Sequence, residues 1–526
     1  MKKTLSLMLA LILALCIPTA LAENTFPLTE QPVTFTALSR TNAFYPNGHI
    51  GEVGNMKAYE DMTNIHIEWE DVDPSVFATR LAGVIAGDAA DYPDIIFKGN
   101  ITNEQSYEWG HEGILVDLKP YMEEYMPNFT ALCKEYPDIL QAITTDDGHI
   151  YGLPQVVPYA PMKMPDKFYY NNKYVEASGL KVPTNTDELF DFLVAFRDSD
   201  FNGNGKADEV GISSSVNFLY GYFYGTFGLG TRGVQHNNVV DVDPETREIR
   251  IFGASENYRK FLEYLHKLYS NQLIYQEIYT EGDATNVLSA DDRLAVCLAT
   301  TLSAVPKTKV DNWVGLKTQL VGPDGYNIAS QARSTLHTVG NMVVTSHCKD
   351  VGLILKWVDY FYGEEGSLFY HAGVKGVNWE IKEDGSYGYT DEFLATWSDE
   401  MTQDTFLAQA CLWPGGRNPA VMSASLWGGE YEAEPAATAY ALKDYAPEIV
   451  WPIISWTEDE NEVISRYLAD IRSYITKNTA AIVSGEAELT DEWWNKYVTD
   501  IQNMGADKVI DAYTSALTRI YGEGNW

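Results

Sequence analysis

Cysteine is scarce in this chain, with five residues in 526. One of them, Cys16, lies in the apolar N-terminal segment. The other four are isolated, with no C-x-x-C pair and no zinc-ligand spacing, which argues against a disulfide framework and against a structural zinc site. We therefore expect buried free thiols at the remaining positions, Cys133, Cys297, Cys348 and Cys411.

Basic residues are also few. The 37 Lys and Arg residues face 74 Asp and Glu residues, which gives a formal net charge of -37. Nucleic-acid phosphates require clustered Lys and Arg, so this balance argues against nucleic acid as a partner and equally against docking on anionic lipid. An acidic surface also disfavours a polyanionic solute, although a local group of Arg or Lys could override that effect.

Long apolar runs are missing after the N-terminus. No later stretch approaches the 18 apolar residues of a membrane-spanning helix. The N-terminus itself has two lysines, a short apolar run from Leu5 to Ile17 and a small-residue site ending at Ala22. This pattern predicts a signal peptide over residues 1–22 and an exported, soluble mature chain, either extracellular, at the cell surface or periplasmic.

Cys16 offers an alternative to plain cleavage after Ala22. In a lipoprotein, the signal is cut before a cysteine that then carries the lipid anchor. The residue before Cys16 is Leu15, where such signals usually place Gly, Ala or Ser. The sequence therefore favours signal-peptide cleavage after Ala22 over lipidation of Cys16.

Common catalytic motifs are absent too. The sequence has no G-x-S-x-G, H-E-x-x-H, P-loop or G-x-G-x-x-G pattern, and its nine histidines form no metal-binding pair. We expect a binding protein rather than an enzyme. Two alternatives remain open: a secreted glycoside hydrolase, which needs only a pair of carboxylates, and a calcium-dependent glycan-binding adhesin, which would usually show sequence repeats.

The most informative stretch present is residues 196–212, which places five oxygen-bearing side chains and two glycines in one short loop. Calcium takes six to eight oxygen ligands, and alternate-residue spacing lets a curled loop direct them inward. One register starts at Asp198 and satisfies the EF-hand pattern, which requires a helix after the loop. The Val-Gly-Ile-Ser-Ser-Ser that follows is not helical, so we favour the second register. Its ligands are Asp200, Asn202, Asn204, the carbonyl of Lys206, Asp208 and Glu209.

The expected role of this Ca2+ is structural. The ion would fix the end of a helix expected over residues 186–197 without contacting a solute. A metal-free turn rich in Asn, Gly and Asp is the simpler alternative.

The N-terminal third alternates between strand and helix patterns. Such alternation predicts an α/β lobe with a largely parallel sheet, in which ligands lie beyond the carboxyl ends of the strands. The strands are expected at 33–38, 65–70 and 94–97, and the helices at 53–63 and 77–86. Towards the C-terminus, apolar residues at helical spacing over 464–482 and 493–501 predict a helical region.

Several segments, in order, carry a family resemblance. They are Tyr59-Glu-Asp-Met-Thr-Asn-Ile-His-Ile-Glu-Trp69, the Ala86–Ile96 stretch with Gly-Asp and Tyr-Pro-Asp, Asp147-Gly-His-Ile-Tyr-Gly-Leu-Pro154, Tyr169–Thr184 and the closing segments 475–485 and 494–505. Together they resemble the family 1 extracellular solute-binding proteins of bacterial ABC sugar importers, in the lipoprotein-type and alginate-binding branch. The loop ligands from Asp200 to Glu209 also match that branch. Asn64 departs from the family's preferred Gly, and Cys16 lacks the usual lipobox.

The resemblance implies a two-lobed, type II-like periplasmic-binding-protein fold with hinge-crossing segments and a helical C-terminal region. It places residues 23–160 and about 300–400 mostly in the first lobe, and 161–300 and about 400–526 mostly in the second. It also implies a monomer that captures a carbohydrate, expected to be an oligosaccharide, and delivers it to ABC transporter permease subunits. The sequence does not identify the solute; a uronate or a peptide stays open.

Sugar-binding proteins stack aromatic rings on sugars and bind hydroxyls with amides and Arg. The chain has 13 Trp and 34 Tyr. Predicted strand ends, an aromatic run interrupted by glycines and two Pro/Gly loops supply the candidate ligand-binding residues. These are Tyr45, Asn100, Tyr220, Tyr222, Trp379, Trp413 and Arg417. Each could instead be a core residue, and Tyr159 and Tyr170 could serve a hinge.

Overall fold

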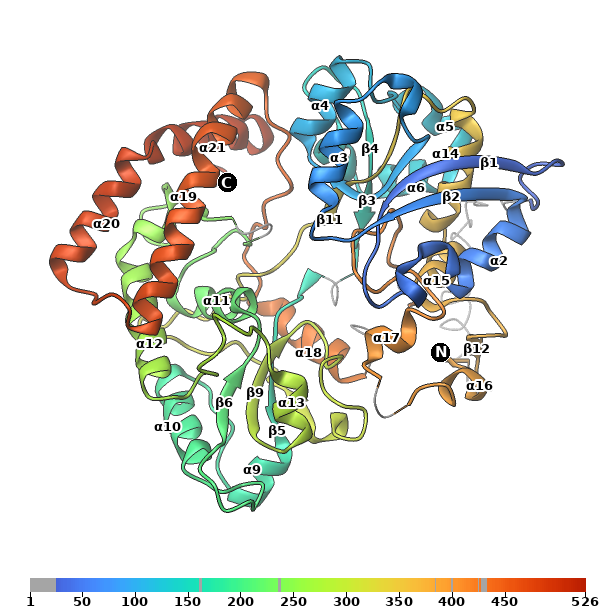
Figure 1. The fold of residues 1–526 in the computed structure, drawn as a ribbon. Helices are drawn as coiled ribbons and strands as arrows, with labels where there is room; N and C mark the ends of the chain where they lie inside the picture. Colours follow the sequence, from blue (N-terminus) through green and yellow to red (C-terminus); the bar gives the residue numbers. More distant parts are fainter. Residues whose placement is uncertain are drawn as a thin grey trace, which may run out of the picture.

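We describe the fold from a computed structural model. It describes residues 25–159, 163–234, 238–383, 385–398, 401–423, 425–426 and 433–526. The predicted signal peptide at 1–22, with Cys16 and Ala22, lies outside these residues. Two α/β lobes, each built on its own sheet, make up the molecule, as expected for a two-lobed binding-protein fold (Figure 1). Among the described helices, none is both long and apolar enough to cross a membrane.

The first lobe contains a five-stranded sheet of order β2-β1-β3-β11-β4. Strands β1 and β2, and β1 and β3, pair in parallel, whereas β11 runs antiparallel to β3 and β4. The strands are β1 (Val33–Arg40), β2 (Ile65–Val72), β3 (Ile95–Ile101), β4 (Gly152–Val156) and β11 (Leu336–Val344). The helices of this lobe are α2 (Gly54–Thr63), α3 (Phe77–Ile85), α4 (Asn103–His111), α5 (Met122–Tyr125), α6 (Pro127–Glu135), α7 (Asp138–Ile143), α14 (Val351–Asp359) and α15 (Glu364–Ala372). The three strands and two helices expected here are confirmed.

The backbone conformation of Asn64 explains why Asn can replace the Gly that the family prefers at this position. Asn64 ends α2 in the left-handed conformation, with φ of 59°. Gly is the usual residue there, and Asn is the side-chain-bearing residue that tolerates this conformation best. Its side-chain amide donates a hydrogen bond to the Thr29 carbonyl at 3.0 Å. The substitution therefore keeps the helix terminus and adds a contact to the N-terminal segment.

The second lobe contains a four-stranded sheet of order β10-β5-β9-β6. Its strands are β5 (Lys167–Asn171), β6 (Val210–Ser213), β9 (Leu294–Ala299) and β10 (Trp313–Gly315). Its helices are α9 (Asn172–Ser178), α10 (Thr186–Arg197), α11 (Val216–Tyr224), α12 (Glu256–Ser270), α13 (Thr285–Ala290), α18 (Ala433–Leu442), α19 (Glu458–Ser484), α20 (Asp491–Asn503) and α21 (Ala506–Tyr521). A small β7–β8 hairpin (Val240–Val242 and Ile249–Ile251) belongs to this lobe. The β12–β13 hairpin (Trp379–Ile381 and Tyr387–Tyr389) and the short helices α16 (Asp391–Leu394) and α17 (Gln403–Leu407) follow α15.

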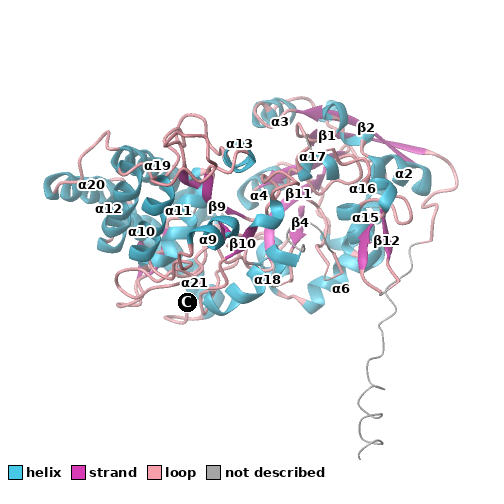
Figure 2. Cartoon of the chain, turned by 90° about the horizontal axis from the view of Figure 1, so that it is seen from below, coloured by secondary structure: helices cyan, strands magenta, loops and turns pink. Residues whose placement is uncertain are grey.

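The C-terminal helices complete the core of the second lobe. Ile471 and Ile475 of α19 and Tyr497 of α20 are buried in one cluster with Phe261 of α12. Helix α19 begins with a capping box, in which Thr457 and the Glu460 side chain exchange hydrogen bonds with each other's backbone. Figure 2 shows these helices stacked at the end of the molecule away from the first sheet. The helical C-terminal region is confirmed.

The chain crosses between the lobes more than once. Val157 N donates to the Thr335 carbonyl at 2.7 Å, and Arg333 N donates to the Lys163 carbonyl at 2.8 Å, so two crossing segments run side by side. β10 belongs to the second sheet, whereas Val421 is buried in the first core. We therefore propose that the crossings lie between Val156 and Phe168, between Leu320 and Leu336, and between Val421 and Ala433, as a refinement of the approximate boundaries at 300 and 400.

Candidate functional site

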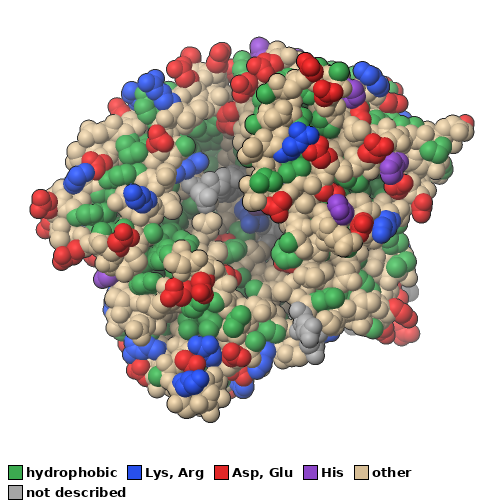
Figure 3. Space-filling view, in the orientation of Figure 1, with side chains coloured by type: hydrophobic (Ala, Val, Ile, Leu, Met, Phe, Trp, Pro, Cys, Tyr) green, Lys and Arg blue, Asp and Glu red, His purple; other side chains and the backbone are tan. Residues whose placement is uncertain are grey.

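Two adjoining cavities lie between the lobes, inside the hollow seen in Figure 3. The larger has a volume of about 830 Å³ and the smaller about 350 Å³. Asn238 and Arg472 line both, so the two cavities are neighbours. Their sizes fall within the usual range for small-molecule binding sites.

Strand ends of the first lobe form one wall. Asn100 and Ile101, at the end of β3, and Thr338 of β11 line the smaller cavity, and His337 of β11 lines the larger. The carboxyl ends of parallel strands meet at one edge of a sheet, where binding sites of α/β folds form. Asn100 has φ of 53°, a left-handed conformation that Asn tolerates. The placement of Asn100 at the cleft agrees with the position expected from the sequence.

Helix α11 of the second lobe forms the opposite wall of the larger cavity. The helix begins at the cavity, where the Ser215 hydroxyl accepts a hydrogen bond from Phe218 N. Asn217 and Tyr220 follow on the same wall. The Tyr220 hydroxyl shares a 2.7 Å hydrogen bond with the Tyr279 hydroxyl, which fixes the ring at the cavity edge.

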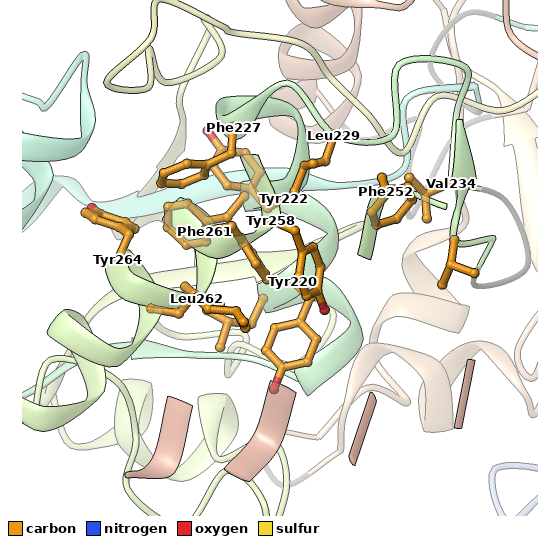
Figure 4. Close-up of a cluster of buried hydrophobic side chains, with 14 of the residues drawn as sticks. Tyr220, Tyr222, Phe227, Leu229, Val234, Phe252, Tyr258, Phe261, Leu262 and Tyr264 are labelled. Atoms are coloured by element: carbon orange, nitrogen blue, oxygen red, sulfur yellow. The ribbon is translucent and has the colours of Figure 1, made fainter. Parts of the chain in front are cut away.

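Tyr222 belongs to the core rather than to the cleft wall. Its ring is 3% exposed, lies 5.5 Å from that of Phe168, and does not line either interlobe cavity. The segment is a helix, so residues two apart point in different directions. The aromatic run is neither a loop nor a strand but helix α11, and Tyr220 packs against Phe261 of α12. Figure 4 shows Tyr220 and Tyr222 among the rings of Tyr258, Phe261 and Tyr264.

Tyr45 is likewise buried, although it follows a strand end. Lys98 Nζ donates to the Tyr45 hydroxyl at 2.7 Å and to the Leu412 carbonyl at 3.0 Å. Lys98 also donates to Asn418 Oδ1 at 2.9 Å. Burial lowers the pKa of the Lys98 ammonium well below its ordinary value. This group anchors the 412–418 segment to β3, and Tyr45 lines neither cavity.

The three remaining candidates also lie away from the two cavities. Trp379 is buried and its Nε1 donates to the Gly373 carbonyl at 2.9 Å. Trp413 is half-buried between two small hydrophobic clusters. Arg417 is half-buried near Arg40, and burial lowers the pKa of its guanidinium. The two interlobe cavities therefore bring together Asn100 and Tyr220 but none of these three.

Sequence reasoning missed a polar stripe on α19. Arg472, Ser473, Thr476 and Lys477 all line the larger cavity. They occupy positions i, i+1, i+4 and i+5, beside the apolar face that packs on α12. Arg333, in the second crossing, lines the same cavity. The helical period of the polar residues was the available signal, and the stronger apolar period obscured it.

The predicted calcium loop connects the C-terminal end of α10 to strand β6. Backbone N–H groups of the loop donate to side-chain oxygens of the same loop. Asp200 accepts from Gly205 N at 3.0 Å, and Asn204 Oδ1 accepts from Lys206 N at 2.8 Å. Gly203 and Gly205 have φ of 72° and 78°, which permits the tight curl. The loop leads into strand β6 rather than a helix, as expected.

Glu209 is the buried carboxylate of this loop. Glu209 is 4% exposed; its Oε1 accepts from Phe201 N at 2.9 Å, and its buried Oε2 has no partner among the described residues. Asp198 pairs instead with Arg197 at 2.9 Å and its side chain is 61% exposed, which agrees with the register that starts at Asp200. Within the described part of the chain, His, Cys, Asp and Glu side chains nowhere gather in threes as metal ligands. Within the loop, the Asp208 carboxylate pairs with Arg293 at 3.2 Å.

The four cysteines of the described chain are buried and free, as expected. Burial raises the pKa of the Cys133, Cys348 and Cys411 thiols to about 12. These thiols therefore remain protonated and unreactive at neutral pH.

Comparison with known proteins shows to which family this chain belongs. The model of the family "Bacterial extracellular solute-binding protein" matches residues 52–367, more than half of the chain. The chain belongs to this family. This solute-binding protein is 24% identical over 507 residues to the fructooligosaccharide ABC transporter substrate-binding protein FusA of Streptococcus pneumoniae serotype 4, covering 91% of this chain and 89% of FusA.

Solved structures agree with the fold of this solute-binding protein. The alginate-binding protein AlgQ2, in a structure without calcium ion, is similar with a TM-score of 0.75 and 19% identity, covering 94% of this chain and 99% of AlgQ2. FusA in complex with kestose is similar with a TM-score of 0.73 and 21% identity, covering 93% of this chain and 99% of FusA. Both likenesses extend over nearly the whole described chain.

Proposed function

We propose that this solute-binding protein captures an oligosaccharide in the cleft between its lobes and delivers it unchanged to ABC transporter permease subunits. The observation that carries the proposal is the 830 Å³ cavity, lined by rings, hydroxyls and amides of the second lobe and closed on the other side by His337 of the first lobe. Aromatic rings stack on sugar faces, and amides such as those of Asn217, Asn238 and Gln331 match sugar hydroxyls. The name of FusA, a fructooligosaccharide transporter protein, supports a carbohydrate solute.

Closure of the lobes couples capture to transport. A solute that contacts both His337 of β11 and Ser473 of α19 binds the closed form better than the open form and so stabilises it. The closed monomer then presents a different surface to the permease.

Binding without catalysis fits the charged groups of the site. Asp166 is the one carboxylate among the described residues that line the larger cavity, and Glu104 lines the smaller. Glycoside hydrolases act with a pair of carboxylates on either side of the scissile bond. We therefore favour a binding protein over the hydrolase alternative.

We further propose that one structural Ca2+ occupies the loop between α10 and β6. Its ligands would be the side chains of Asp200, Asn202, Asn204, Asp208 and Glu209 and the carbonyl of Lys206. The unpartnered, buried Glu209 Oε2 supports this, as do related structures described as an EF-hand mutant of FusA and as AlgQ2 without calcium ion. The ion would hold the end of α10 against β6.

The family is extracellular, and we propose that residues 1–22 direct export and are removed after Ala22. Lipidation of Cys16 is the alternative. Mass spectrometry of the mature N-terminus distinguishes the two.

A glycan panel tests the function. A ligand at 100 times its Kd adds about 2.7 kcal/mol to the stability of the folded form, which a thermal-shift assay detects. We expect saturation near one oligosaccharide per chain, with the bound sugar recovered unchanged by chromatography. Release of shortened products, or no shift with any glycan, would contradict the proposal.

A further inference from the structure

Among the described residues that line the cleft, basic side chains outnumber acidic ones, whereas acidic residues outnumber basic ones in the whole chain. The whole sequence carries twice as many acidic as basic residues. Of the charged side chains lining the two cavities, Arg333, Arg472 and Lys477 are basic, whereas Asp166 and Glu104 are acidic. Figure 3 shows Lys and Arg side chains inside the hollow, while Asp and Glu side chains are spread over the outer surface.

The basic side chains of the cleft are available to a ligand. Among the described residues, no ion pair joins Arg333, Arg472 or Lys477 to a carboxylate. Arg472 forms a side-chain hydrogen bond with Tyr513, but its buried Nε has no hydrogen-bond partner among those residues. A buried guanidinium nitrogen without a partner loses its hydration and gains nothing in return.

The positions of these cations favour recognition over fold stabilisation. Arg333 lies in a crossing segment and Arg472 lies on α19, so they approach the same space from two different parts of the chain. Elsewhere in this lobe Arg250 pairs with Asp241 at 2.8 Å and Arg519 with Glu460 at 2.6 Å, whereas Arg232 lies outside the two cavities and donates to backbone carbonyls. In a protein with surplus carboxylates, cations left unpaired in a cavity indicate an external anion.

We propose that the solute is an acidic oligosaccharide, whose carboxylate or sulfate groups are bound by Arg333, Arg472 and Lys477. This rests on the proposed function and adds the chemical class of the sugar. Guanidinium groups bind the planar carboxylate through paired N–H donors, and they bind sulfate oxygens by the same donors. The Tyr220 ring and the amides of the cleft would bind the uncharged parts of each sugar unit.

Matched sugars test the charge preference by isothermal titration calorimetry. Tetragalacturonate and tetramannuronate are compared with their carboxyl-reduced, neutral counterparts. A sulfated chondroitin tetrasaccharide is compared with its desulfated form, which separates sulfate from carboxylate recognition. We expect at least one acidic sugar to bind tenfold or more tightly than its neutral partner, with a preference that weakens from 20 to 200 mM NaCl.

Variants locate the preference in the cleft. Arg333→Gln and Arg472→Gln should each reduce affinity for the acidic sugar about tenfold and affect the neutral counterpart less than threefold. Arg466→Gln is the matched control, because Arg466 lies on the exposed side of the same helix and the change in net charge is identical. If Arg472→Gln fails to fold, Arg333→Gln and Lys477→Gln provide the comparison.

The outcomes separate this inference from the function on which it rests. Neutral sugars that bind as tightly as, or more tightly than, their acidic partners would overturn the inference and leave sugar binding intact. An acid preference unchanged in both Arg333→Gln and Arg472→Gln would also overturn it. Failure of every glycan to bind would overturn the proposed function itself.

Discussion

The ammonium group of Lys307 lies 4.8 Å from the centre of the Trp397 ring. Lys307 follows Leu302 and Val305, which pack in the second lobe, and Trp397 packs on Phe406, whose neighbour Ala410 is bonded to α2 of the first lobe. The contact therefore joins the lobes at a point outside the two cavities. Such a contact stabilises the lobe arrangement of this structure, and we expect that arrangement to be favoured in the closed, solute-bound form.

Replacement of this lysine should loosen closure. A cation–π contact at an exposed site contributes about 0.5–1 kcal/mol, so Lys307→Gln should lower solute affinity about two- to fivefold. The loss should come from faster dissociation, measured by stopped-flow fluorescence, with a larger radius of gyration in solution scattering. Lys309→Gln is the control, because Lys309 pairs with Asp292 inside the second lobe at 2.8 Å. Equal effects of the two variants would argue against an interlobe role.

Tyr220 and Tyr222 should respond differently to substitution. Tyr220→Leu removes a ring from the cavity wall and should lower sugar affinity about tenfold, while retaining most of the apolar contact with Phe261. Tyr222→Leu opens space beside Phe168 and should lower stability by about 1–3 kcal/mol with affinity nearly unchanged. Calorimetric titration and urea unfolding of both variants provide the comparison. The reverse assignment of effects would place the sugar elsewhere.

Chelation should lower thermal stability before it lowers sugar affinity. Addition of EDTA should reduce the melting temperature of the second lobe by several degrees, since about 1 kcal/mol corresponds to 2–4 °C in a domain of 150–250 residues. Added Ca2+ should restore it. Glu209→Gln should abolish the response to Ca2+, whereas Asp198→Asn should keep it because Asp198 pairs with Arg197. A melting curve unaffected by EDTA would contradict the calcium site.

His371 should make the first lobe sensitive to acid. Burial lowers the pKa of this imidazole to about 4, and its Nδ1 lies 2.8 Å from the Ser367 carbonyl. Between pH 6.5 and 4 the unfolded chain binds a proton at this residue and the folded chain does not, so stability falls as the pH falls through that range.

The expected loss of folding stability is large enough to measure. It reaches about 3 kcal/mol by pH 4, at 1.36 kcal/mol per pH unit. The stability advantage of the wild type over His371→Gln, measured by urea unfolding, should therefore shrink on acidification. A constant difference between pH 7 and pH 4 would contradict the buried, neutral state of His371.

The elements with strong periodicity were predictable. Strand β1, helix α10 and the C-terminal helices show clear apolar repeats, and their bounds differ from expectation by few residues. Helix α11 was not predictable, because its Phe- and Tyr-rich sequence with Gly221 has no marked preference for helix over strand. Its conformation depends on tertiary packing against α12.

Chain topology alone was enough to place one of the candidate residues at the cleft. Asn100 lies at a strand end and faces the cleft, as the α/β rule requires. Tyr45 also follows a strand end, yet its hydroxyl bonds to Leu412, 367 residues later in the sequence. No local pattern contains such a partner, and the same holds for Arg333 and Arg472, which meet at one cavity only in the folded chain.

One wall of the larger cavity is formed by helix α19, which lies late in the sequence. Helix α19 begins at Glu458, and the Tyr258 hydroxyl beneath the cavity bonds to Thr479 at 2.6 Å. A nascent chain therefore cannot assemble the proposed sugar-binding surface until residues 458–484 have been synthesised. Its half-built second lobe, with the apolar side of α12 uncovered, is a natural substrate for chaperones.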